Sequence, residues 1–167
     1  MRKRLLHGRS GGFSLIELLM VVGIIGVLAA IVIWQYLGAI QKGRGKKTMA
    51  DMHSLGVALE ARATDNGGYN AAGSFAWPAN VLAYSDVVAE LQPTYTKQIP
   101  MLDGWNRPFE FAVNQPLGST TRADTYGIRS GGRDGVFEAS YDTEETSNFD
   151  CDIVFTNGTF VAHPKTN

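Results

Sequence analysis

Hydrophobic residues are concentrated in one long run near the N-terminus. Residues 18–34 contain no polar side chain, and residues 13–40 contain a single charged one, Glu17. Seventeen helical residues span about 26 Å, and the apolar flanks extend the helix past the roughly 30 Å hydrocarbon core of a bilayer. A helix that is apolar on every side needs a membrane or a large assembly to cover it. The pattern therefore predicts a transmembrane helix over residues 13–40.

The spacing of apolar residues changes after this run. Met52, Leu55 and Leu59 recur at intervals of three and four, which is the pattern of an amphipathic helix. The sequence Asp65-Asn66-Gly67-Gly68 then favours a helix end. We expect one helix over about residues 13–65, with Gly38, Gly43 and Gly45 as its flexible points in an assembly.

The remaining chain has shorter apolar runs, which predict strands. They cover residues 109–113, 125–129, 153–156 and 159–162, and a short helix is predicted over Val81–Leu91. Asn157-Gly158 separates the last two runs and favours a tight hairpin, because both turn positions require positive φ. The expected fold class is α+β, with a small antiparallel sheet packed on the amphipathic half of the long helix.

Charge divides the chain into zones, although the total is balanced. Fifteen basic and sixteen acidic residues give a net charge of −1, which does not favour nucleic acid as a partner. Residues 1–12 hold four basic residues and no acid, residues 41–47 are again basic, and acids dominate from Asp134 onward. The single cysteine, Cys151, excludes an intramolecular disulfide and a cysteine-based zinc site.

The N-terminus has two simpler explanations. A discarded secretory signal has an apolar region of roughly 7–15 residues followed by a small-residue cleavage site. Here the run is longer, and the small residues Gly11-Gly12 precede it. A plain single-pass anchor is the other explanation.

Glu17 is an acidic residue within this apolar segment. A carboxylate in lipid costs about 2.5–3.5 kcal/mol at the bilayer centre and less near the interface. Such a residue usually has a partner, and the amine created by cutting before Phe13 of a neighbouring copy would provide one. The alternative is that Glu17 lies at headgroup level.

The sequence Gly12-Phe13-Ser14-Leu15-Ile16-Glu17, followed by a long apolar helix, resembles the type IV pilin and type II secretion pseudopilin family. The resemblance implies that a prepilin peptidase cuts between Gly12 and Phe13 on the cytoplasmic side and that Phe13 is then N-methylated. It also implies that Glu17 pairs with a neighbour's N-terminal amine during assembly. Residues 1–12 would be the cleaved leader and 41–167 a periplasmic globular domain.

Three further segments resemble the major pseudopilins of type II secretion, the GspG group. They are residues 103–109 (DGWNRPF), residues 126–135 (YGIRSGGRDG) and residues 150–153 (DCDI). Gly104 and Asn106 depart from that group's pattern, and the insert over residues 136–149 is longer than in typical relatives.

The resemblance implies a calcium site with Asp134, Asp150 and Asp152 as ligands. Calcium prefers six to eight oxygen ligands, several of them carboxylates. Cys151 interrupts the acidic pair, and a thiol is a poor calcium ligand. The alternative is a solvated acidic loop.

The leading functional hypothesis is a structural subunit of the periplasmic pseudopilus of type II secretion. It would lie in the inner membrane before assembly, surrounded by lipid. Its partners would be further copies, other pseudopilins, the prepilin peptidase and the inner-membrane secretion platform. The alternatives are a type IV pilin of a surface fibre and a non-polymerising anchored module that binds calcium or another ligand. The chain contains no motif for a catalytic nucleophile, a phosphate loop, a zinc protease or a dinucleotide site, so no enzyme is expected.

Overall fold

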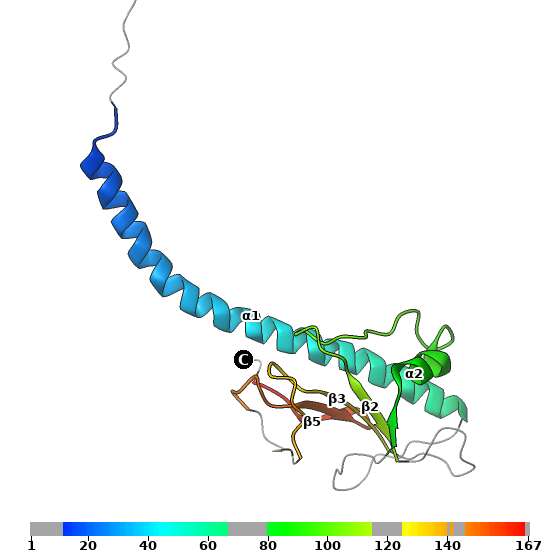
Figure 1. Ribbon diagram of the computed structural model, residues 1–167. Helices are drawn as coiled ribbons and strands as arrows, with labels where there is room; N and C mark the ends of the chain where they lie inside the picture. Colours follow the sequence, from blue (N-terminus) through cyan, green and yellow to red (C-terminus); the bar gives the residue numbers. More distant parts are fainter. Residues whose placement is uncertain (1–11, 67–79, 115–124, 140, 142–145, 166–167) are drawn as a thin grey trace, which may run out of the picture. The chain divides into compact units, whose positions relative to one another are not determined.

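The computed structural model describes residues 12–66, 80–114, 125–139, 141 and 146–165. The chain divides into two compact units, Met1–Ala39 and Ile40–Asn167. The elements, in chain order, are α1 (Leu15–Asn66), β1 (Asn80–Leu82), α2 (Tyr84–Leu91), β2 (Glu110–Val113), β3 (Tyr126–Ser130), β4 (Ile153–Thr156) and β5 (Thr159–Ala162) (Figure 1).

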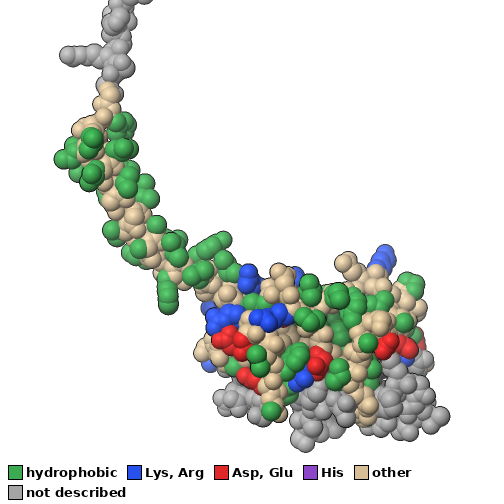
Figure 2. Space-filling view, viewed as in Figure 1, with side chains coloured by type: hydrophobic (Ala, Val, Ile, Leu, Met, Phe, Trp, Pro, Cys, Tyr) green, Lys and Arg blue, Asp and Glu red, His purple; other side chains and the backbone are tan. Residues whose placement is uncertain are grey.

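Helix α1 is continuous over 52 residues, which confirms the long helix predicted from the sequence. It passes through Gly38, Gly43 and Gly45, so their role as flexible points in an assembly stays a prediction. Every side chain of residues 12–39 is exposed, and Figure 2 shows hydrophobic side chains covering this part of the helix. An 18-residue window reaches a mean hydropathy of 2.9 and is not buried at all, so length and composition suffice to cross a membrane.

The five strands form one antiparallel sheet in the order β1-β2-β3-β4-β5. Phe111 of β2 lies opposite Ile128 of β3, which in turn lies opposite Phe155 of β4. The turn between β4 and β5 has φ values of 45° at Asn157 and 84° at Gly158. The predicted hairpin and the expected α+β class are therefore confirmed.

The short helix predicted over Val81–Leu91 is wrong at its beginning. Residues Asn80–Leu82 form strand β1, in which Val81 lies opposite Ala112 of β2, and helix α2 starts only at Tyr84. A short apolar run fits a strand or a helix equally well, and residue 83, an alanine, provides no side-chain cap to mark the helix start. The pairing with β2 decides between them.

The second half of α1 packs on the sheet through the predicted apolar stripe. Met52 and Leu55 are almost completely buried, and Leu59 is buried as well. They join one core cluster with Phe111, Ile128 and Phe155 of the sheet and with Val87 and Leu91 of α2. The amphipathic segment is thus covered within the chain, whereas the side chains of residues 12–39 are not.

Gly56 tests this packing, because it lies on α1 directly against the Phe155 ring of β4. A Cβ at Gly56 would lie 2.2 Å from Cε1 of Phe155, whose buried ring is held against Tyr126 and Phe160. We expect Gly56→Ala to lower the free energy of unfolding by about 1–3 kcal/mol.

Gly43→Ala is the matched control, because nothing lies within 4 Å of the added methyl group. Here only helix propensity changes, and we expect stabilisation of up to about 1 kcal/mol. Urea titration of both variants in detergent, followed by near-ultraviolet circular dichroism, measures the difference. Equal stability of the two variants would contradict the close packing at Gly56.

Candidate functional site

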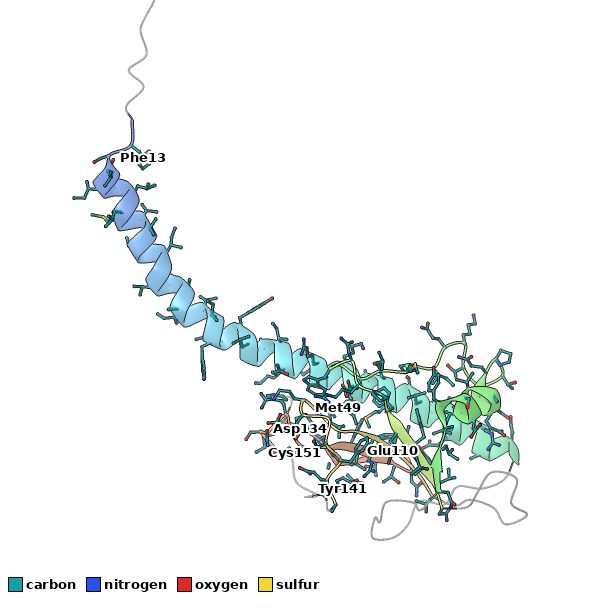
Figure 3. The ribbon with its side chains drawn as sticks, viewed as in Figure 1. Phe13, Met49, Glu110, Asp134, Tyr141 and Cys151 are labelled. Atoms are coloured by element: carbon teal, nitrogen blue, oxygen red, sulfur yellow. The ribbon has the colours of Figure 1, made fainter. Side chains whose placement is uncertain are left out.

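The predicted cleavage site lies in an accessible segment ahead of the helix. Gly12, Phe13 and Ser14 precede α1, and nothing lies within 4 Å of a Cβ built on Gly12. The Phe13 side chain is 82% exposed (Figure 3). Exposed, non-helical chain of this kind is what a peptidase needs in order to bind the peptide bond.

Glu17 has a partner within its own chain. The backbone N–H of Ser14 donates to Oε2 of Glu17 at 2.9 Å. Since α1 begins at Leu15, Ser14 is its N-cap and Glu17 its third residue, the positions of a capping box. The spacing Ser-x-x-Glu is the signal for this bond in the sequence. The exposed carboxylate keeps further acceptor positions for an amine.

Asp103 organises the segment over residues 103–109, a role that the sequence did not reveal. Its carboxylate is completely buried. Oδ1 accepts the backbone N–H groups of Trp105 at 2.8 Å and Arg107 at 2.9 Å, and Oδ2 accepts the hydroxyl of Ser130 at 2.6 Å. Asp103 therefore joins this loop to the end of β3.

The same loop binds to α1. The backbone N–H of Gly104 donates to Oγ1 of Thr48 at 2.9 Å, and the Trp105 indole N–H donates to Oε1 of Gln41 at 2.7 Å. A Cβ at Gly104 would lie 2.3 Å from the Arg44 carbonyl oxygen, so only glycine fits at this approach. The loop thereby fixes the domain to the first turns of α1 that belong to it.

The predicted calcium ligands have protein partners of their own. The Arg133 guanidinium binds both carboxylate oxygens of Asp150, with Nε–Oδ1 at 2.6 Å and Nη2–Oδ2 at 2.5 Å. This ion pair holds the pKa of the Asp150 carboxyl below its ordinary value. Oδ1 of Asp134 accepts the backbone N–H of Val136 at 2.9 Å and closes a local turn.

Asp152 is the exception among the three. Its side chain is 1% exposed, Oδ2 accepts the backbone N–H of Glu138 at 3.0 Å, and Oδ1 has no hydrogen-bond partner in the described part of the chain. Burial raises the pKa of the Asp152 carboxyl from 3.8 to about 6, against the opposing effect of the Glu138 bond. One free oxygen leaves most of a calcium coordination shell unfilled.

The described residues do not assemble the three-carboxylate site that the resemblance implies. Within the described ranges, no three His, Cys, Asp or Glu side chains lie close enough to hold a metal ion. Cys151 is half-buried, 3.8 Å from Oγ1 of Thr146. Figure 3 shows Asp134 and Cys151 in the same region of the domain. Calcium binding stays a prediction, and no step of the proposed function depends on it.

Arg129 anchors the long insert, which is a role that the sequence did not reveal. Its guanidinium binds Oε1 of Glu110 on the neighbouring strand at 2.6 Å and the Tyr141 hydroxyl at 2.5 Å. It also lies 4.1 Å from the centre of the Phe137 ring. The insert over residues 136–149 is thus joined to the sheet at both Phe137 and Tyr141.

The buried Asp152 predicts a specific pH dependence of stability. The folded chain binds its proton more tightly than the unfolded chain, so the free energy of unfolding falls as pH rises from about 4 to about 6. The full effect is up to about 3 kcal/mol. Asp152→Asn resembles the protonated form, so we expect its stability relative to the wild type to rise over this window.

Urea titrations of both proteins at pH 4 and pH 7.5, with a chelator present, measure this difference. A constant difference between the two proteins would show that Asp152 does not titrate in this way. Adding millimolar calcium at pH 7.5 tests the metal prediction separately, because a ligand that binds only the folded chain raises its stability.

Comparison with known proteins agrees with the resemblance described for the sequence. Residues 8–33 match the family described as the prokaryotic N-terminal methylation motif. A type II secretion system core protein G of Pseudomonas aeruginosa is 26% identical over 137 residues, which cover 76% of this chain and 88% of that protein. No solved structure matches the chain significantly.

Two further relatives are similar to parts of the chain. A type II secretion system core protein G of Aeromonas hydrophila is 30% identical over 104 residues, covering 61% of this chain and 72% of that protein. The type IV major fimbrial protein FimA of Dichelobacter nodosus is 37% identical over 84 residues, about half of each chain. These are structural subunits rather than enzymes. With the methylation motif, the long apolar helix and the five-stranded sheet in place, the chain belongs to the pilin and pseudopilin family that includes type II secretion system core protein G.

Proposed function

We propose that this protein is the filament-forming subunit of a periplasmic pseudopilus that drives protein export in type II secretion. One observation carries the proposal: the apolar segment over residues 15–39 is exposed along its whole length while the domain has its own complete core. A surface of this kind is stable in lipid or against copies of itself. The similarity to core protein G over most of the chain supports the secretion system as the setting.

Assembly would transfer this helix from lipid into a bundle of identical helices. Each helix contacts neighbours through different faces, so the contact is head-to-tail and extends into a fibre rather than closing. A carboxylate at Glu17 that meets the amine of a neighbour's first residue would set the register between copies, because an unpaired charge in this apolar bundle is costly. Other pseudopilins and the inner-membrane platform would be its partners.

Processing would precede assembly. The prepilin peptidase would cut between Gly12 and Phe13 at the cytoplasmic face, and methylation of Phe13 would follow. The cut removes the four basic residues of the leader and creates the amine that Glu17 requires. The domain over residues 41–167 would then lie in the periplasm, joined to the inner membrane by a single helix.

A type IV pilin of a surface fibre is the second candidate. It is favoured by the 37% identity to the fimbrial protein, although that similarity covers only about half of each chain. Both candidates use the same helix and the same Glu17, so the biochemical tests below address their shared mechanism. Export of a secreted protein in a strain lacking this subunit separates the two.

The mature N-terminus is the first test. We expect protein purified from cells that contain the peptidase to begin at Phe13 and to carry one additional methyl group, as measured by N-terminal sequencing and intact mass. Gly12→Trp places a bulky side chain next to the bond, and we expect it to leave the precursor uncut. A mature chain that begins elsewhere would remove the proposed amine.

Glu17 is tested by two substitutions that separate charge from helix capping. Glutamine at this position retains the capping box and loses the charge, whereas alanine loses both. If the carboxylate pairs with an amine, we expect Glu17→Gln and Glu17→Ala to abolish the ladder of cross-linked oligomers equally. The measurement is chemical cross-linking of membranes from cells that produce each variant.

The outcomes are distinct. A ladder that persists in Glu17→Gln and disappears in Glu17→Ala would assign Glu17 to capping alone. Persistence in both variants would contradict the filament mechanism. Ser14→Ala, which removes the capping side chain while keeping the backbone N–H that Glu17 accepts, is the control.

A further inference from the structure

Four basic residues surround α1 where it enters the domain, and the proposed function assigns them no role. This basic collar consists of Lys42, Arg44, Lys46 and Lys47, all with exposed side chains. Lys47 pairs with Asp51 at 3.5 Å on the helix surface. No acidic residue occurs between residues 18 and 50. The space-filling view shows Lys and Arg side chains gathered on the surface of the domain (Figure 2).

The collar faces outward in several directions. At about 100° per residue, the four side chains lie at roughly 0°, 200°, 40° and 140° around the helix axis, counted from Lys42. The buried residues Gly45, Thr48 and Met52 fill the remaining sector, at roughly 300°, 240° and 280°. Cations thus cover all of the helix perimeter that the domain leaves open. A medium that surrounds the helix fits this distribution better than a single protein surface on one side.

The position of the collar along the helix matches a bilayer. From Phe13 to Gln41 the helix rise amounts to about 42 Å, and a bilayer with its headgroup layers is about 40–45 Å thick. With Phe13 at one headgroup layer, the collar therefore reaches the other.

Aromatic side chains mark the same boundary. Trp34 and Tyr36 precede the collar and are 82% and 63% exposed. Trp34 lies about 12 Å before Lys42 along the axis. Tryptophan and tyrosine are enriched where a transmembrane helix leaves the hydrocarbon, because their rings are apolar and their N–H or O–H groups bind water or headgroups.

We propose that the basic collar binds the phosphates of anionic phospholipid headgroups in the leaflet next to the globular domain. The inference rests on the proposed membrane-spanning stage before assembly. Lysine and arginine beside a membrane surface attract anionic lipid, and the attraction weakens with salt. The contacts hold the subunit at a fixed depth, and they must be exchanged when the subunit leaves the membrane.

The test uses the full-length chain in phosphatidylcholine vesicles that contain spin-labelled phosphatidylglycerol or spin-labelled phosphatidylcholine. Electron paramagnetic resonance gives the relative association of each lipid with the protein. We expect the wild type to prefer phosphatidylglycerol. Lys46→Gln/Lys47→Gln should reduce that preference by roughly twofold or more, and added salt should reduce the wild-type preference to the level of this variant.

Lys97→Gln/Lys165→Gln is the matched control, because it removes the same charge from exposed lysines elsewhere on the domain. The basic leader contributes equally in every variant. A collar variant that retains the full preference, or a control that loses it equally, overturns the proposal. Loss of cross-linked oligomers in the collar variant with unchanged lipid preference also overturns it, and assigns the collar to a neighbouring copy.

Lipid preference and oligomer formation can be measured separately, so the proposed function and the lipid contact of the basic collar are tested independently. Lipid association is measured on unassembled protein, and Glu17 lies about 37 Å from Lys42 along the helix. Glu17→Gln should therefore keep the preference for phosphatidylglycerol even where it abolishes the oligomers.

Discussion

The structure depends on one helix that the chain covers along only half of its length. From Met52 onward, side chains of α1 enter a core shared with the sheet and α2. Residues 12–39 have no such cover, and their side chains remain exposed. The hydrophobic effect therefore binds this segment to lipid or to copies of itself, because no other part of the described chain covers it. The apolar segment is bounded by an acidic residue, Glu17, near its beginning and by basic residues after its end.

The domain is attached to this helix by polar contacts as well as by apolar packing. Apolar packing at Leu55 and Gly56 fixes the sheet, and the loop held by Asp103 adds hydrogen bonds to Gln41 and Thr48 nearer the apolar segment. Both hydrogen bonds are partly buried, so breaking them without replacement would leave polar groups poorly hydrated and unpaired. The helix and the domain are thus joined by hydrogen bonds to helix side chains as well as by the core.

Sequence periodicity predicted the elements that are determined locally. The long helix, the strands β2 to β5 and the Asn157-Gly158 turn follow from apolar spacing and turn chemistry, with bounds close to those observed. Strand β1 was missed because its conformation is decided by pairing with β2, about thirty residues later. The role of Arg129 was missed for the same reason, since its partners Glu110 and Tyr141 are distant in the sequence. For Asp103 the distant partner is Ser130, whereas its bonds to the N–H groups of Trp105 and Arg107 are local. The Ser14–Glu17 bond had a local signal in the sequence, the spacing Ser-x-x-Glu.

The acidic loop shows that a resemblance can give the residue types of a site without giving the contacts that those residues make. Arg133 stands one residue before Asp134 and folds onto Asp150, while the Arg107 guanidinium donates to the Arg133 carbonyl at 2.9 Å. Gly135 makes room for Arg107, because a Cβ there would lie 1.8 Å from its Nη1. The described loop therefore has cations of its own. A metal ion that binds Asp150 would first have to displace the bidentate guanidinium of Arg133. Because one charge-assisted pair is then exchanged for another, the net binding free energy of the metal is smaller. Asp152 differs from Asp150, because its side chain is buried and its Oδ1 has no hydrogen-bond partner among the described residues.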